Sequence, residues 1–97
     1  MELLTEGIAG TLESSDALVK IRNNPETGIQ IHLQSVVEKR YGKQIRQVIA
    51  DTLARLEVRH AWVEVNDKGA LDCTIRARLQ AAVFRAAKID AYPWEEL

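Results

Sequence analysis

Two adjacent hydroxyls between two carboxylates, in the stretch GTLESSD at residues 10–16, form the most chemically suggestive cluster near the start of the chain. Ser14 and Ser15 lie between Glu13 and Asp16 there. A polar turn would explain this composition, because serine and aspartate side chains bond readily to the amides of turns. A serine hydroxyl on such a turn is also a point at which a group can be attached covalently. From the chemistry alone, both interpretations stay open.

Other kinds of site have little support in the sequence. His32, His60 and Cys73 are the residues best suited to bind a metal, but they lack the CxxC or HxxxH spacing of metal ligands. No GxSxG elbow surrounds the serines, and the chain contains no glycine-rich phosphate loop. We therefore predict no metal site and no catalytic residue.

The composition is that of one ordinary globular domain. The 97 residues are 46% hydrophobic and 28% charged, which predicts a single domain over residues 1–97. No apolar run approaches the roughly 18 residues of a membrane span. The opening MELLTEGIAG has no basic and long apolar regions of a signal peptide, and the single cysteine cannot form an internal disulfide. We expect a cytoplasmic protein without a membrane partner.

Three short strands are predicted in the first third of the chain. Residues 8–12 are short and mixed, whereas residues 16–22 and 29–33 alternate between apolar and polar side chains. Turn-forming residues fill the interval 23–28. Short strands joined by tight turns favour an antiparallel meander with one face in water.

The rest of the chain predicts a helix, a strand and a second helix. Ser35 and Glu38 have the spacing of a capping box, and Gly42 is expected to bend or interrupt the helix that follows. Residues 58–65 alternate as a strand. Residues 70–87 have apolar side chains at helical spacing. Their start, 70–76, also alternates, so strand and helix both stay open there, with helix favoured.

The resulting order is β-β-β-α-β-α. It predicts an α+β fold, a two-layer sandwich in which a small antiparallel sheet carries two main amphipathic helices on one face. An aromatic tail, Tyr92-Pro93-Trp94, ends the chain. Its proline prevents a simple helical continuation.

A nucleic-acid-binding or structural α+β module, with Ser14 as a turn residue, is the alternative function. The basic residues Lys39, Arg40, Lys43 and Arg46 lie close together and would suit phosphates. Against nucleic acid stand the isoelectric point of about 6.1 and the aromatic content of 5%, with no aromatic stacking position on the strands. Composition alone does not decide between these classes.

Motifs along nearly the whole chain resemble the acyl carrier subunit, or gamma chain, of bacterial citrate lyase. The matching segments, in the order of the family, are AGTLES at 9–14 with Asp16, SVVEK at 35–39, Gly42-x-x-Ile45-Arg46, LAR at 53–55, DKGALDC at 67–73, IRARL at 75–79 and PWE at 93–95. DKGALDC and IRARL are far more specific than any generic motif.

The resemblance implies that Ser14 carries a covalent 2'-(5''-phosphoribosyl)-3'-dephospho-CoA group through a phosphodiester. The thiol of that group would carry acetyl and then citryl. The residue after the attachment serine is often glycine in the family, whereas this chain has Ser15. Chemistry alone leaves the choice between the two serines open, and the distance from residues 10–12 favours Ser14.

The resemblance also implies partners, because such a carrier has no active site of its own. An alpha subunit would act as acyl transferase, a magnesium-using beta subunit as citryl lyase, and a transferase would attach the prosthetic group. The net reaction of the complex would convert citrate to acetate and oxaloacetate, as in citrate fermentation. Glu13 and Asp16 are then candidate docking contacts for basic partner surfaces.

Overall fold

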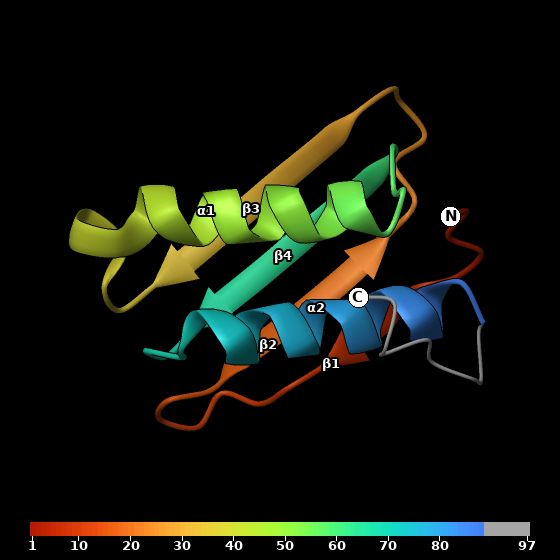
Figure 1. The fold of residues 1–97 in the computed structure, drawn as a ribbon. Helices are drawn as coiled ribbons and strands as arrows, with labels where there is room; N and C mark the ends of the chain where they lie inside the picture. Colours follow the sequence, from red (N-terminus) through yellow and green to blue (C-terminus); the bar gives the residue numbers. More distant parts are fainter. Residues whose placement is uncertain (89–97) are drawn as a thin grey trace.

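The computed structural model describes residues 1–88, so the aromatic tail at 92–94 lies outside the described part. The elements in chain order are β1 (Gly7–Ala9), β2 (Ala17–Arg22), β3 (Ile29–Ser35), α1 (Glu38–Arg55), β4 (Ala61–Asp67) and α2 (Asp72–Ala86). This is the predicted order β-β-β-α-β-α, and Figure 1 shows both helices on the same face of one sheet. The predicted α+β fold class and its two-layer arrangement are confirmed.

The order of the strands in the sheet is β1-β2-β4-β3, so the predicted antiparallel meander is wrong. β2 pairs antiparallel with both β1 and β4, but β3 pairs parallel with β4, from Ile29 opposite Ala61 to Ser35 opposite Asp67. The sheet is therefore mixed. The chain leaves β3, runs back through α1 and returns in β4, which is the crossover that parallel neighbours require.

The burial of β4 and β3 agrees with their central and edge positions in the sheet. The side chains of β4 that face the helices, Ala61, Val63 and Val65, are buried, and β2 presents a matching buried row. In β3 the corresponding residues are less well covered, and Ile29 is 38% exposed. A strand that is covered less completely belongs at the edge of a sheet, where one side of its backbone meets solvent.

The predicted capping box at the start of α1 is wrong. The Ser35 hydroxyl donates to Asp67 Oδ2 at 2.7 Å, and the helix begins at Glu38 without a side-chain cap. Asp67 is fully buried, so leaving its carboxylate without hydrogen-bond donors would cost more free energy than leaving a solvent-exposed helix start uncapped. The predicted interruption at Gly42 does not occur either, since α1 is continuous from Glu38 to Arg55.

Residues 70–76 form a helix start rather than a strand. α2 begins at Asp72, and its buried side chains follow helical spacing: Ile75, Leu79, Gln80, Ala82, Val83, Phe84 and Ala86. The apparent alternation fails at its first members, because Leu71 and Cys73 are exposed. No helix within residues 1–88 is long and apolar enough to cross a membrane.

Candidate functional site: the Ser14 turn

The stretch around Ser14 is the loop that joins β1 to β2 at one edge of the sheet. Asp16 N donates to Glu13 O at 3.1 Å, which closes a β-turn with Ser14 and Ser15 at its two central positions. Ser15 has a φ of 66°, in the left-handed region that favours glycine. A positive φ at the third residue is the pattern of a type II turn, in which glycine is the usual residue.

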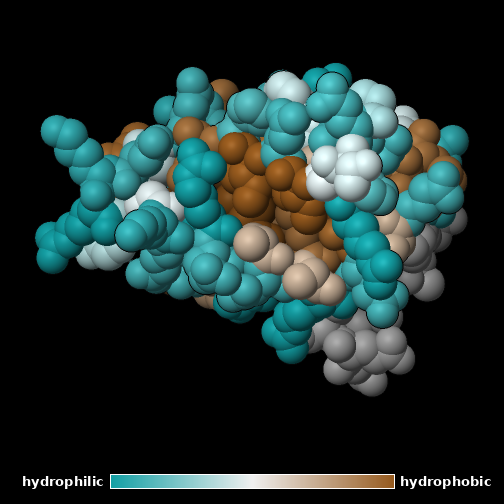
Figure 2. Space-filling model, turned by 90° about the horizontal axis from the view of Figure 1, so that it is seen from above, coloured by the Kyte–Doolittle hydropathy of each residue, from teal (hydrophilic) through white to brown (hydrophobic). Residues whose placement is uncertain are grey.

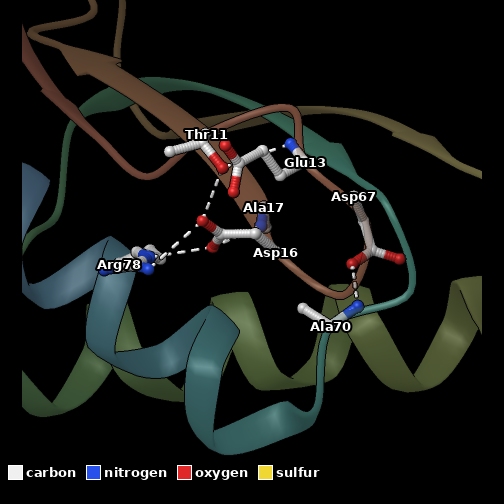
Figure 3. A network of polar contacts seen from close by, with 7 residues as sticks. All are labelled: Thr11, Glu13, Asp16, Ala17, Asp67, Ala70 and Arg78. Carbon is white, nitrogen blue, oxygen red and sulfur yellow. Dashed lines mark hydrogen bonds and ion pairs between the residues drawn. The ribbon is translucent and has the colours of Figure 1, made fainter.

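Asp16 holds the end of this turn through its side chain. Its Oδ1 accepts from Arg78 Nε at 2.9 Å and from Ala17 N at 2.7 Å, while Oδ2 accepts from Thr11 Oγ1 at 2.7 Å and Arg78 Nη2 at 3.2 Å (Figure 3). The Asp16 side chain is only 14% exposed. The guanidinium of Arg78, followed by the Thr11 hydroxyl and the Ala17 amide, holds the pKa of this carboxyl far below its usual range.

Backbone hydrogen bonds tie the turn to the loop between β4 and α2. Ser15 N donates to Lys68 O at 2.8 Å, and Lys68 N donates to Asp16 O at 2.9 Å. The neighbouring Asp67 accepts from Ala70 N at 2.9 Å as well as from Ser35. The base of the turn is thus held by α2, through Arg78, and by the β4–α2 loop, through Lys68, and Figure 3 shows both around it.

Gly10 permits the tight entry into this loop. It has a φ of 90°, and a Cβ atom at this position would lie 1.8 Å from the carbonyl oxygen of Ala17. Any side chain there would displace the start of β2, so glycine is required for the close approach of the two strands.

The two serine hydroxyls take no part in the hydrogen bonds of this supporting network. Both serines are exposed, and within residues 1–88 neither hydroxyl has a hydrogen-bond partner in the protein. Nothing in the described structure competes for the oxygen of Ser14, and the turn beneath it is held by Asp16. The arrangement suits a hydroxyl that is offered to another molecule.

Neither histidine of the chain is bonded to the Ser14 hydroxyl. His60 Nδ1 accepts a hydrogen bond from Gly28 N, and His32 stacks on Trp62 with ring centroids 4.1 Å apart. Both histidines are therefore engaged elsewhere in the fold. No cluster of side chains that could hold a metal ion occurs within residues 1–88.

The sheet face opposite the helices departs from one sequence expectation. The sequence predicted no aromatic stacking position on the strands, but Trp62 of β4 lies on this face. Its ring already contacts His32, and the Arg22 guanidinium carbon lies 4.9 Å from the ring centroid. Of the basic residues of α1, Arg46 reaches this face and lines one pocket with His32 and Lys20, whereas Arg40 lies over Tyr41.

Thr11 and Arg78 are the members of the site that sequence reasoning misses. Arg78 lies 62 residues from Asp16, and only the packing of α2 against the sheet brings them together. Arg78 belongs to the IRARL segment, whose specific match to a carrier family was the one available sign of its importance. Thr11 lies inside the GTLESSD stretch, but no local rule distinguishes it from a spare turn hydroxyl.

Comparisons with known proteins agree on one family. The family model for the malonate decarboxylase delta subunit, an acyl carrier family, matches residues 5–86. The citrate lyase acyl carrier protein of Streptococcus mutans is 50% identical over 97 residues, and that of Streptococcus pyogenes is 53% identical. Each alignment covers 100% of this chain and 95% of the relative.

Several solved structures share the fold, including chains of a malonate decarboxylase and a homoserine kinase. A chain of a Pseudomonas malonate decarboxylase hetero-tetramer in complex with malonate superposes with a TM-score of 0.68 at 17% identity, covering 86% of this chain and 84% of its own. Homoserine kinase from Cytophaga hutchinsonii gives a TM-score of 0.60 at 12% identity, over 100% of this chain but 39% of the kinase. Identities this low speak for the fold alone, whereas the full-length identities to the streptococcal proteins show the family. The chain belongs to the family of citrate lyase acyl carrier proteins, which are the non-catalytic carrier subunits of the citrate lyase complex.

Proposed function

We propose that Ser14 carries the prosthetic group of this acyl carrier, attached through a phosphodiester to its hydroxyl. The observation that carries the proposal is an exposed hydroxyl that has no partner within residues 1–88, on a turn whose base is held by Asp16. A long arm needs an accessible attachment point on a rigid base, and the turn meets both requirements. The group we propose is 2'-(5''-phosphoribosyl)-3'-dephospho-CoA, whose thiol carries acetyl and citryl as thioesters.

The backbone conformation favours Ser14 over Ser15 as the attachment point. Ser15 occupies the left-handed position of the turn, and its amide is bonded to Lys68 O. A position with positive φ favours glycine, which accounts for the glycine common there in the family. The side chain of residue 15 is therefore dispensable, whereas residue 14 supplies the hydroxyl.

The two carboxylates that flank the serines have different proposed roles. Both were expected to dock on basic partner surfaces, and for Glu13 this stays a proposal, since its exposed side chain makes no ion pair within residues 1–88. Asp16 directs both carboxylate oxygens into the fold. We assign it to holding the turn, so that the hydroxyl of Ser14 keeps one orientation toward each partner.

The residues of this chain hold the arm, and the partner subunits perform the reactions on it. The proposed partners are an alpha subunit that exchanges acetyl for citrate, a beta subunit that cleaves the citryl thioester, and the transferase that attaches the group. Tethering replaces diffusion between these sites by an effective concentration on the order of millimolar. We place this work in the cytoplasm, within one carrier domain spanning residues 1–97.

Intact mass spectrometry of the chain purified from a citrate-fermenting host tests the attachment point. We expect a covalent adduct and one thiol beyond Cys73, both absent in Ser14→Ala and both retained in the matched control Ser15→Ala. An adduct that survives Ser14→Ala and disappears in Ser15→Ala would move the site to the neighbouring serine. An active complex whose carrier chain has no adduct would refute the proposal altogether.

A further inference from the structure

β3 forms one edge of the sheet, and its outer side pairs with no other strand within residues 1–88. The Ile31 carbonyl on that side accepts instead from the exposed guanidinium of Arg46, with Nη1 at 3.2 Å. Alternate residues of a strand direct their backbone groups to the same side, so Ile29 and Leu33 share the outer edge with Ile31. This edge therefore offers amides and carbonyls with which another strand can pair.

An apolar groove lies directly beside this edge, between β3 and the second half of α1. Its lining consists of Ile29, Ile31, Ala50, Ala54 and Val58, with Glu57 and Arg59 at one end. Figure 2, seen from above, shows apolar surface gathered at the centre of this side and framed by hydrophilic side chains. Apolar side chains next to unpaired strand backbone are the combination that binds an extended peptide by strand addition.

The charges around the groove indicate what kind of segment it would accept. Arg46 lies where the middle of β3 meets α1, and Arg59 lies at the Val58 end of the groove. Within residues 1–88 the one ion pair is that of Arg78 with Asp16, so neither guanidinium forms an ion pair, although Glu57 lines the groove beside Arg59. A segment with carboxylates at matching positions would complement both arginines.

The location of the groove separates it from the attachment site. β3 is at the opposite edge of the sheet from β1, after which the Ser14 loop follows. Figure 1 shows the β1–β2 loop and the start of β3 at diagonally opposite corners of the molecule. A subunit held at the β3 edge would keep the Ser14 turn free to present its arm.

A second copy of this chain fits the edge less well. Two-fold pairing about the middle of β3 would bring the Arg46 side chains of both copies together, because each is bonded to Ile31 O. Like charges placed opposite each other disfavour an interface.

We propose that the free edge of β3 and the adjoining groove dock an extended segment of a partner subunit of citrate lyase, apolar at alternate positions and with carboxylates that meet Arg46 and Arg59. On docking, Arg46 releases the Ile31 carbonyl to the incoming strand and pairs with a carboxylate instead. This interface is independent of Ser14, so failure of one proposal leaves the other standing.

Hydrogen–deuterium exchange of the full chain, alone and in complex with the alpha and beta subunits, tests the strand pairing. The amides of Ile31 and Leu33 should become protected when the complex assembles, and more so than the exposed amides of the 23–28 loop. Unchanged exchange along β3 on assembly would overturn the proposal. Protection that appears in the isolated chain as its concentration rises would assign the edge to a second copy, and would overturn it as well.

Matched substitutions test the groove and its charges. Ile31→Lys places a charge in the groove, and its control Gln30→Lys places the same charge on the opposite face of the same strand. Arg46→Glu is matched by Lys39→Glu at the exposed start of α1. We expect Ile31→Lys and Arg46→Glu to weaken binding to the partner subunits about tenfold or more, as loss of one interface anchor does. The prosthetic-group adduct should be retained in all four variants, whose thermal unfolding identifies any that fail to fold. Equal binding by the folded members of each pair would refute the docking site.

Discussion

Arg78 of α2 donates two hydrogen bonds to the carboxylate of Asp16, from Nε to Oδ1 at 2.9 Å and from Nη2 to Oδ2 at 3.2 Å. The two residues are 62 positions apart, and Asp16 is the last residue before β2. Their contact joins the second helix to the turn that carries Ser14. The orientation of that turn therefore depends on the packing of α2 as well as on its own sequence.

Loss of the Arg78 guanidinium should loosen the turn more than it destabilises the fold. Because the Arg78 side chain is 42% exposed, solvent screens the pair, and Arg78→Met should lower the free energy of unfolding by only about 1 kcal/mol. The hydrogen–deuterium exchange rate of the Ser15 amide should rise. Attachment of the prosthetic group, followed by intact mass spectrometry, should slow. Arg76→Met, on the same helix, is the control. Identical exchange at Ser15 in both variants would exclude the proposed role of Arg78.

Stability at acid pH should report the state of Asp16. Its pKa in the folded chain lies below the ordinary value of 3.8, so the ionised carboxylate stabilises the fold. This contribution is complete above that ordinary value and is lost as the pH falls toward the lowered pKa. Urea unfolding should be measured from about pH 7 to about pH 2.5. The free energy of unfolding of wild type should exceed that of Asp16→Asn, and this gap should shrink below about pH 4. Glu13→Gln, which alters a carboxylate without an ion pair among the described residues, should show a smaller gap. A pH-independent gap for Asp16→Asn would contradict the assignment.

Glycine at position 15 should increase the stability of the fold, whereas glycine at position 14 should not. A non-glycine residue in the left-handed region is strained by about 1–2 kcal/mol, part of which is offset by the greater chain entropy of glycine when unfolded. Ser15→Gly should therefore raise the free energy of unfolding by up to about 1 kcal/mol and keep the adduct. Ser14→Gly should lower stability and abolish the adduct. Chemical denaturation together with intact mass measures both, and destabilisation by Ser15→Gly would speak against the turn conformation.

Two glycines with positive φ should differ sharply in their tolerance of a methyl group. In Gly10→Ala the new Cβ would lie 1.8 Å from Ala17 O, whereas at Gly28 nothing lies within 4 Å of such an atom. Gly28→Ala should lower the free energy of unfolding by about 1 kcal/mol through backbone strain alone. Gly10→Ala should lower it by more than about 3 kcal/mol or prevent folding, because the backbone itself must move. Equal effects in thermal denaturation would contradict the close approach of the two strands at Gly10.

Local patterns in the sequence determined the elements and the faces they bury. Val19, Ile21, Val63 and Val65 alternate along strands, and Ile45, Ile49 and Leu53 recur at helical spacing. Each of them is buried as its period requires. The turn at Ser14 followed from composition, and the family followed from specific motifs. Period and composition are properties of neighbouring residues, so they can be recognised in the sequence without knowledge of the fold.

Only the tertiary structure decided the strand order, the start of α1 and the partners of Asp16. β4 pairs with both β2 and β3 and leaves β3 at the edge, although both strands alternate in the sequence. Ser35 gave its hydroxyl to the buried Asp67 instead of capping a helix. Arg78 reached Asp16 across 62 residues. In each case, competition between distant groups for burial or for a hydrogen-bond partner set the outcome, and no local pattern records that competition.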